Sequence, residues 1–265
     1  RQPAGCTNSL HSHRTAEVFI IHTGSWRMFW GLEGDDGEVV LNPGDLISLP
    51  THMFRGFENV TPISGTNERG YGFIFSVLGG DDSGGGVVWA PEVLEEASNH
   101  GLTLLESGQL VNTREGEEIP EGIPPVTPVS KTGLSFHSRN TITDASKFVV
   151  KRPAEWVHRE TELIGRSSNA VIRERPGFEV RRVQWGNGDE IPWRVSNLDT
   201  VLISNTGSVV LSGGETLGAG DVALIQAGEE EIDVKPLPGG VSELFVVIGT
   251  DDPAGETRLL DGGAK

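Results

Sequence analysis

The chain is poor in cysteine and in long apolar runs. Cys6 is the only cysteine among 265 residues, which excludes an internal disulfide framework and favours a reducing compartment, so we expect a cytoplasmic protein. No segment approaches the roughly 18 apolar residues that span a membrane, and positions 1–20 contain no hydrophobic signal-peptide core. The sequence therefore predicts no membrane partner.

Basic residues are also scarce. Lysine and arginine total 21 against 38 aspartates and glutamates, which gives a formal net charge of −17. Such a surface repels phosphate backbones and anionic lipids, so the net charge disfavours binding to nucleic acid or membranes by bulk electrostatics. The excess charge favours solubility and does not identify a ligand.

Turn-forming residues are abundant instead. The chain holds 36 glycines and 15 prolines, and its hydrophobic fraction is 36%. This composition fits many short strands joined by tight turns and fits a helical bundle badly, so we expect an all-β fold. The length allows one large domain or two of about 130 residues each.

Strand-like segments rich in β-branched and aromatic residues occur in two groups. The first group is 18–22, 26–30, 38–41, 46–49, 53–57 and 72–77. The second group is 147–151, 162–164, 169–173, 178–184, 200–204, 208–211, 222–226, 231–234 and 244–249. Their spacing, with almost no helical periodicity, indicates sandwiches or barrels.

The two groups are separated by a stretch of different character. It contains one predicted helix at 91–100, with Pro91 in its first turn and Gly101 just past its end. We therefore predict a first barrel at 1–80, a partly helical connector at 81–139, a second barrel at 140–252 and a tail at 253–265.

Three candidate metal ligands lie near the start of the chain. His11, His13 and Glu17 are separated by even numbers of positions, so along an extended strand their side chains point to one face. Two imidazoles and one carboxylate converging on one point suit Fe(II), Mn(II) or a related divalent ion.

This spacing is similar to a known family pattern. Gly5, His11, His13, Glu17 and Gly24 match every defined position of the first cupin motif, G-x5-H-x-H-x3-E-x6-G. The second cupin motif, G-x5-P-x-G-x2-H-x3-N, is matched at three positions, namely Gly44, Pro50 and Asn59. Two positions depart from it, because His52 replaces the inner glycine and Arg55 replaces the histidine that is the fourth metal ligand in most cupins.

Arg55 leaves two interpretations open, because a guanidinium cannot ligate a cation. In the first, His11, His13 and Glu17 hold the metal while Arg55 binds an anionic group of the substrate. In the second, Arg55 pairs with Glu17 and the pocket is a metal-free relic. We take Glu17 and Arg55 as candidate catalytic residues.

Other residues near the motifs are candidate substrate contacts. His52 could also swing in as a replacement ligand. Trp26, Met28 and Trp30 share one face of a strand, which fits either a core or a wall for an apolar ring. We therefore add His52, Trp26 and Met28 to Arg55 as candidate substrate-binding residues.

The second half repeats the glycine skeleton without the ligands. The first-motif spacing recurs with Gly188, Arg194, Ser196, Thr200 and Gly207. The second-motif spacing recurs with Gly220, Gln226, Gly228, Glu231 and Lys235. Glycines kept while ligands are lost indicate a barrel retained for structure, so the chain resembles a bicupin with a degenerate C-terminal barrel.

The resemblance implies several functions. Bicupins of the quercetin- and gentisate-dioxygenase-like groups use O₂ at a divalent metal, so we expect a metal-dependent oxygenase acting on a small, aromatic or carboxylate-bearing molecule. The alternatives are a non-oxidative isomerase or epimerase, and a non-catalytic binding protein. The expected cofactor is iron, with Mn, Ni, Cu or Zn as alternatives, or no metal if the site is a relic. The expected assembly is a homodimer.

Overall fold

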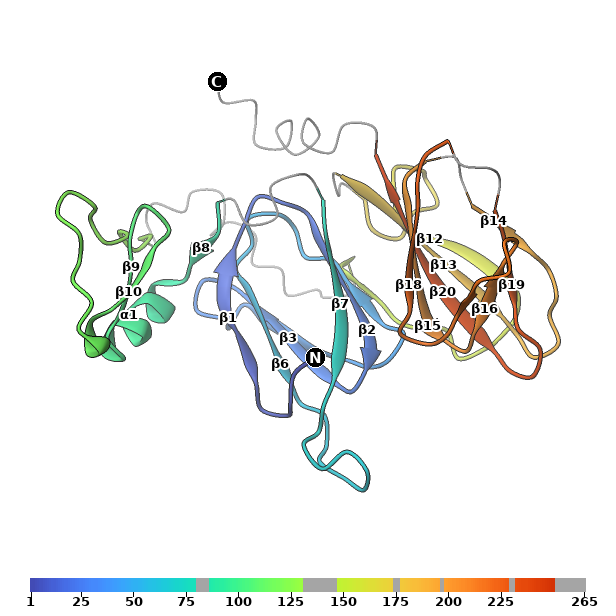
Figure 1. Ribbon diagram of the computed structural model, residues 1–265, viewed down its shortest axis with the longest axis horizontal. Helices are drawn as coiled ribbons and strands as arrows, with labels where there is room; N and C mark the ends of the chain where they lie inside the picture. The colour runs from blue at the N-terminus through green and yellow to red at the C-terminus, as the bar shows by residue number, and fades with distance from the viewer. Residues whose placement is uncertain (80–85, 131–146, 174–176, 196–197, 229–231, 251–265) are drawn as a thin grey trace.

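The computed structural model contains two barrels, and it describes residues 1–79, 86–130, 147–173, 177–195, 198–228 and 232–250 (Figure 1). Each barrel consists of a five-stranded and a four-stranded sheet. The described residues contain one α-helix, and no helix among them is long and apolar enough to cross a membrane. The predicted all-β fold is confirmed.

The N-terminal barrel is made of two antiparallel sheets. The five-stranded sheet has the order β4 (Gly37–Leu41), β3 (Trp26–Trp30), β6 (Arg55–Asn59), β1 (Thr7–Ser12) and β8 (Val88–Trp89). The four-stranded sheet has the order β11 (Val149–Val150), β5 (Leu46–Ile47), β2 (Glu17–Thr23) and β7 (Phe73–Leu78). Alternate side chains of β3 are buried, as expected for a strand with one face on a core.

The C-terminal barrel repeats this plan. Its five-stranded sheet has the order β12 (Arg159–Ile164), β13 (Phe178–Trp185), β20 (Ser242–Gly249), β15 (Thr200–Thr206) and β18 (Val222–Ile225). Its four-stranded sheet has the order β14 (Trp193–Arg194), β19 (Asp233–Pro236), β16 (Val209–Leu211) and β17 (Thr216–Leu217). The predicted strand at 169–173 is wrong, since only Ile172 forms an isolated bridge there, to Ile164.

The segment between the barrels contains the predicted helix, α1 (Pro91–Asn99), with Pro at its start. Gly101 follows it in the left-handed region with φ 81°, a conformation that glycine adopts without strain. An antiparallel pair, β9 (Leu102–Leu104) with β10 (Leu110–Asn112), and a short 3-10 helix, η1 (Thr113–Glu115), come next. β8 pairs with β1, so the start of the predicted connector belongs to the first barrel's sheet.

One strand crosses from one half of the chain to the other. β11 lies within the range 140–252 predicted for the second barrel, yet it pairs with β5 of the first, Val149 opposite Ile47. Polar contacts reinforce this junction: the Lys151 Nζ lies 2.8 Å from Asp45 Oδ2, and the Arg182 guanidinium donates to the Gly44 carbonyl. The first barrel is therefore completed by residues that follow the connector.

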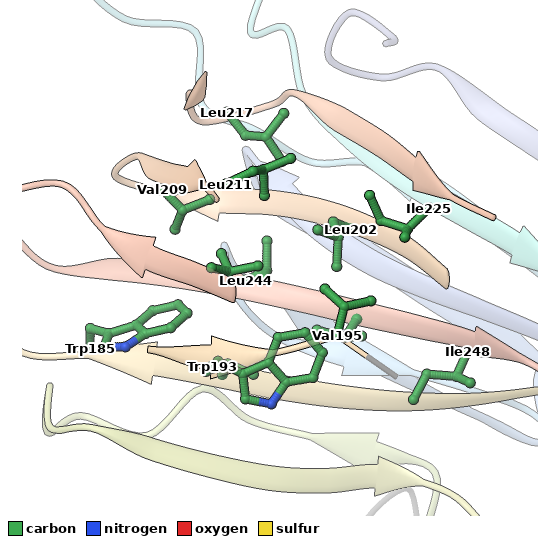
Figure 2. Packing of buried hydrophobic residues seen from close by; sticks show 13 residues of the cluster. Trp185, Trp193, Val195, Leu202, Val209, Leu211, Leu217, Ile225, Leu244 and Ile248 are labelled. Atoms are coloured by element: carbon green, nitrogen blue, oxygen red, sulfur yellow. The ribbon is translucent and has the colours of Figure 1, made fainter. Parts of the chain in front are cut away.

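The C-terminal barrel is packed with apolar side chains (Figure 2). Trp185, Trp193, Leu202 and Leu244 are part of a cluster of 13 buried residues from both of its sheets. Thr200, at the position that corresponds to Glu17, is 1% exposed and donates its hydroxyl to the Leu198 carbonyl. The degenerate character of this barrel is confirmed at that position, while Ser196 and Glu231 lie outside the described residues.

A separate cluster joins the two barrels. It contains Val18 and Ile20 of β2 together with Val180 of β13 and Phe245 of β20, and all four are fully buried. His22, at the end of β2, lies with its Nδ1 3.2 Å from Asn205 Oδ1 of β15. The barrels therefore share a core as well as a strand.

Candidate functional site

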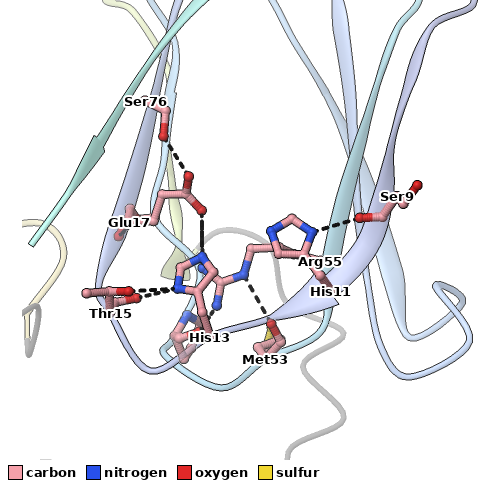
Figure 3. A network of polar contacts seen from close by, with 10 residues as sticks. Ser9, His11, His13, Thr15, Glu17, Met53, Arg55 and Ser76 are labelled. Atoms are coloured by element: carbon pink, nitrogen blue, oxygen red, sulfur yellow. Dashed lines mark hydrogen bonds and ion pairs between the residues drawn. The ribbon is translucent and has the colours of Figure 1, made fainter. Parts of the chain in front are cut away.

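The predicted ligands do not share one strand, because His11 lies on β1, His13 just after it and Glu17 at the start of β2. β1 ends at Ser12, the chain turns at residues 14 and 15, and β2 begins at Glu17. The expectation that shared parity along one strand aligns His11, His13 and Glu17 is therefore wrong in its geometry. The turn nevertheless brings His13 and Glu17 into contact, with Nε2 3.1 Å from Oε2 (Figure 3).

Both histidines present the same nitrogen to a backbone carbonyl. The His11 Nδ1 lies 2.7 Å from the Ser9 carbonyl and the His13 Nδ1 lies 2.8 Å from the Thr15 carbonyl. A carbonyl oxygen only accepts, so each Nδ1 carries a proton. The neutral His11 ring keeps a lone pair on Nε2, whereas the His13 Nε2 donates to the Glu17 carboxylate. This arrangement orients metal-binding histidines in many proteins.

The environments of His11 and Glu17 favour a neutral imidazole and a charged carboxylate. Burial lowers the pKa of His11 below its ordinary 6.5 despite the hydrogen bond to Ser9. Burial raises the pKa of Glu17, but the hydrogen bond from His13, the charge of Arg55 and the hydrogen bond from Ser76 outweigh it, so the net shift is downward. Ser76 of β7 donates to Glu17 Oε1 at 2.6 Å.

Arg55 is buried directly behind this pair, at 1% exposed. Its Nε donates to the Met53 carbonyl at 3.1 Å and its Nη2 to the Pro50 carbonyl at 2.7 Å. Its Nη1 lies 3.7 Å from Glu17 Oε2 and has no hydrogen bond among the described residues. Burial lowers the pKa of Arg55 to about 10, with the charge of Glu17 acting in the opposite direction, so the guanidinium is charged at neutral pH.

A cavity of about 290 Å³ opens beside these groups. Its wall combines polar and aromatic side chains, and it is lined by Arg1, Gln2, Asn8, His11, Glu17, Phe19, Trp26, Phe57, Ile74 and Ser76. Among the predicted site residues, His11, Glu17 and Trp26 face this cavity.

The other predicted residues lie elsewhere. Met28 packs in the core at 2% exposed, and neither Met28, His52, His13 nor Arg55 belongs to the cavity wall. His52 has φ 64°, and its backbone N–H donates to the His13 carbonyl at 2.7 Å. This left-handed backbone explains why glycine is the usual residue at that motif position.

Sequence reasoning missed Gln2, Asn8, Phe57 and Ser76. Ser76 stands opposite Phe19 on the neighbouring strand, and Gln2 reaches the barrel through a bridge to Gly72. These pairings join residues far apart in the sequence, and no local pattern marks them.

The residues fit a divalent metal in their donor chemistry. His13 Nε2 donates to Glu17 Oε2 at 3.1 Å, and a divalent ion that displaced this proton would meet two donor atoms side by side. The ring centres of His11 and His13 lie 5.7 Å apart, and among the described residues no three His, Cys, Asp or Glu side chains are already grouped closely enough to hold an ion. Two donors are thus in place, and the third must turn toward them.

Comparison with known proteins places the fold. No protein-family model and no curated protein matches the chain. The oxalate decarboxylase of Lactobacillus farciminis in its formate complex superposes with a TM-score of 0.54 at 15% identity, covering 94% of this chain and 74% of that one. The oxalate decarboxylase of Bacillus subtilis at pH 4.6 gives a TM-score of 0.53 at 16% identity, covering 96% and 67%.

The match extends over both barrels. The chain therefore has the bicupin fold, and the fold predicted from the two motifs is confirmed. At these identities the likeness concerns the fold, so the chemistry must be argued from the residues of the site.

Proposed function

We propose that the N-terminal barrel is a metal-dependent enzyme site for a small carboxylate-bearing molecule, and that the reaction is an oxygenation. His11, His13 and Glu17 would hold the metal. The observation that supports this most directly is the close approach of two atoms that can each ligate a metal, His13 Nε2 and Glu17 Oε2, at 3.1 Å. When bound, a divalent ion supplies Lewis acidity and, if it is iron or another redox-active metal, O₂ chemistry.

The residues around the pair have complementary roles. Ser76 fixes one oxygen of Glu17, which leaves the other oxygen directed at His13. The carbonyls of Ser9 and Thr15 hold the two imidazoles in the tautomer that exposes Nε2. These contacts preorganise His13 and Glu17, so His11 is the one donor that must move when the site is loaded.

Arg55 determines the charge that a substrate meets. The direct anchor role expected from the sequence does not follow from its position, because Arg55 is not on the cavity wall. Its guanidinium neutralises Glu17 across 3.7 Å, so a bound divalent ion would leave the buried site with a net positive charge. Such a site attracts an anionic substrate, and a carboxylate is the simplest one.

Aromatic walls support oxygenation as the reaction. Phe19, Trp26 and Phe57 border the cavity next to Glu17, and they give an organic substrate an apolar wall to pack against beside the metal ligands. A non-oxidative loss of CO₂ is the second candidate, because the two solved structures compared above are oxalate decarboxylases. Oxygenation is supported if the protein consumes O₂ and releases no CO₂ when O₂ is absent. Decarboxylation is supported if CO₂ is released when O₂ is absent.

Metal stoichiometry tests the site itself. After anaerobic loading with Fe(II) or Mn(II), elemental analysis of the wild type should find about one ion per chain. His13→Ala and Glu17→Gln should abolish it and His11→Ala should weaken it, whereas His158→Ala, a histidine of the other barrel region, should leave it unchanged. Wild-type protein without metal after this loading would favour the relic interpretation.

A further inference from the structure

A second cavity, called here the junction cavity, lies where the two barrels meet. It has a volume of about 480 Å³ and is lined by Arg1, His22, Thr23, Gly24, Asn67, Tyr71, Gly72, Phe73 and Gly220. All of these residues except Gly220 come from the N-terminal half, and Gly220 precedes β18 of the C-terminal barrel. The volume is within the range of pockets that bind small molecules, roughly 300 to 1,000 Å³.

The wall of the junction cavity is basic although the chain is acidic. The formal net charge is −17, yet no aspartate or glutamate is among the described residues that line the cavity, which include Arg1 and His22. The Arg1 guanidinium lies over the ring of Tyr71, 4.1 Å from its centre. Stacking of this kind leaves the N–H groups at the edge of the guanidinium available to an anion.

His22 offers one defined ring nitrogen to a ligand. Asn205 Nδ2 donates to Glu243 Oε1 at 2.8 Å, so the amide oxygen of Asn205 is the atom that faces His22. This oxygen only accepts, and it lies 3.2 Å from His22 Nδ1, so Nδ1 carries a proton. The other nitrogen, Nε2, points toward Gly220, where an added Cβ would lie 3.1 Å from it. Because Gly220 has no side chain, the space next to Nε2 stays open.

Aromatic rings complete the wall. The Phe73 ring lies edge-on to the His22 imidazole, with centres 5.6 Å apart, and edge-on to Phe75, with centres 4.9 Å apart. Tyr71 adds the ring that carries Arg1. The cavity therefore combines apolar ring surface with two groups that can donate to an anion.

We propose that the junction cavity is a second ligand site, and that its ligand is a small organic monoanion with a flat apolar body. The anionic group pairs with Arg1 and with His22, which donates through Nε2 when it is protonated. The flat body lies against Tyr71 and Phe73. None of the proposed metal ligands lines this cavity, so the inference goes beyond the proposed function and does not rest on it.

Calorimetric titration with 2-naphthalenesulfonate tests this assignment, on metal-free and on Mn(II)-loaded protein. The probe should occupy one site per chain, with the same affinity in both forms. Its neutral isostere, 2-naphthalenesulfonamide, should bind at least five-fold more weakly, because it lacks the charge that pairs with Arg1. Methanesulfonate, which has the charge without the rings, should bind at least ten-fold more weakly.

Variants identify which cavity the probe occupies. Arg1→Gln and Phe73→Leu should each weaken binding three-fold or more. Arg1 also lines the cavity next to Glu17, so the decisive comparison is with Phe57, which lines that cavity and not the junction cavity. Phe57→Leu should leave the affinity unchanged, as should Arg166→Gln, at an exposed arginine outside both cavities. Circular dichroism verifies the folding of each variant.

Several results would overturn the inference. They are the absence of saturable binding at about 5 mM probe, equal affinity for the sulfonamide, and affinity that survives Phe73→Leu but is lost in Phe57→Leu. Binding only to the Mn(II)-loaded protein would also overturn it, because the probe would then occupy the metal site. If the protein takes up no metal, the proposed function fails, whereas the titration of metal-free protein still decides this inference.

Discussion

Replacing Arg55 removes a cation that competes with a bound metal ion for the Glu17 carboxylate. The guanidinium Nη1 lies 3.7 Å from Glu17 Oε2, and with an effective dielectric constant near 20 this attraction is worth about 4 kcal/mol. A metal ion that binds Glu17 must share the carboxylate with this cation and is itself repelled by it. Since about 1.4 kcal/mol corresponds to a factor of ten, Arg55→Met should tighten divalent metal binding by about ten- to a thousand-fold. Arg55→His should tighten it further, because it adds an imidazole at the usual fourth-ligand position.

The assay is competition of Mn(II) or Zn(II) between the protein and a chelator of known affinity, made on protein whose folding has been verified by circular dichroism. The matched control is Arg182→Met. Arg182 is another buried arginine, paired with Glu243 at 3.4 Å, and its removal should leave metal affinity unchanged. If both Arg55 variants bind metal no more tightly than the wild type, Arg55 does not compete for Glu17 and the charge argument is refuted.

Two further predictions concern stability. Glu17 has a pKa below its ordinary 4.5, so its contribution to stability is present above about pH 4.5 and is lost as pH falls through the folded-state pKa. The difference in unfolding free energy between wild type and Glu17→Gln, measured by urea unfolding, should therefore shrink toward acid pH. Growth of that difference toward acid pH would contradict the prediction. Gly24 and Gly207 have φ of 81° and 69°, and a Cβ would overlap Thr61 at the first and the Val241 carbonyl at the second. Gly24→Ala and Gly207→Ala should therefore each lower the free energy of unfolding by at least about 2 kcal/mol. A change within about 0.5 kcal/mol for Gly207→Ala in thermal unfolding would show that the second barrel does not need this glycine.

Those glycines also explain why the fold was predictable from the sequence. A left-handed turn is a local requirement, so the doubled spacing around Gly24 and Gly207 indicated two barrels even though only one keeps its ligands. The helix after Pro91 was likewise marked by signals within a few residues of its ends.

The site was less predictable because its geometry depends on turns and distant pairings. Strand parity linked His13 to Glu17, but the chain actually turns between them. Trp26 and Met28 share a strand face, yet only Trp26 reaches the cavity, since a cavity occupies one part of a barrel and parity applies to the whole strand. Asn8 and Ser76 join the cavity wall from strands that are distant in the sequence, which no local pattern encodes.

The core shared by the two barrels gives the C-terminal barrel a structural role, although it lacks the metal ligands of the first. Val18 and Ile20 of the first barrel are buried against Val180 and Phe245 of the second, and β11 supplies an edge strand to β5. A first barrel produced alone would expose this apolar face and an unpaired strand edge, both of which promote aggregation. The second half of the chain thus covers the apolar face and the strand edge that the first barrel would otherwise expose. Its packing surface is therefore needed whether or not this barrel binds a ligand.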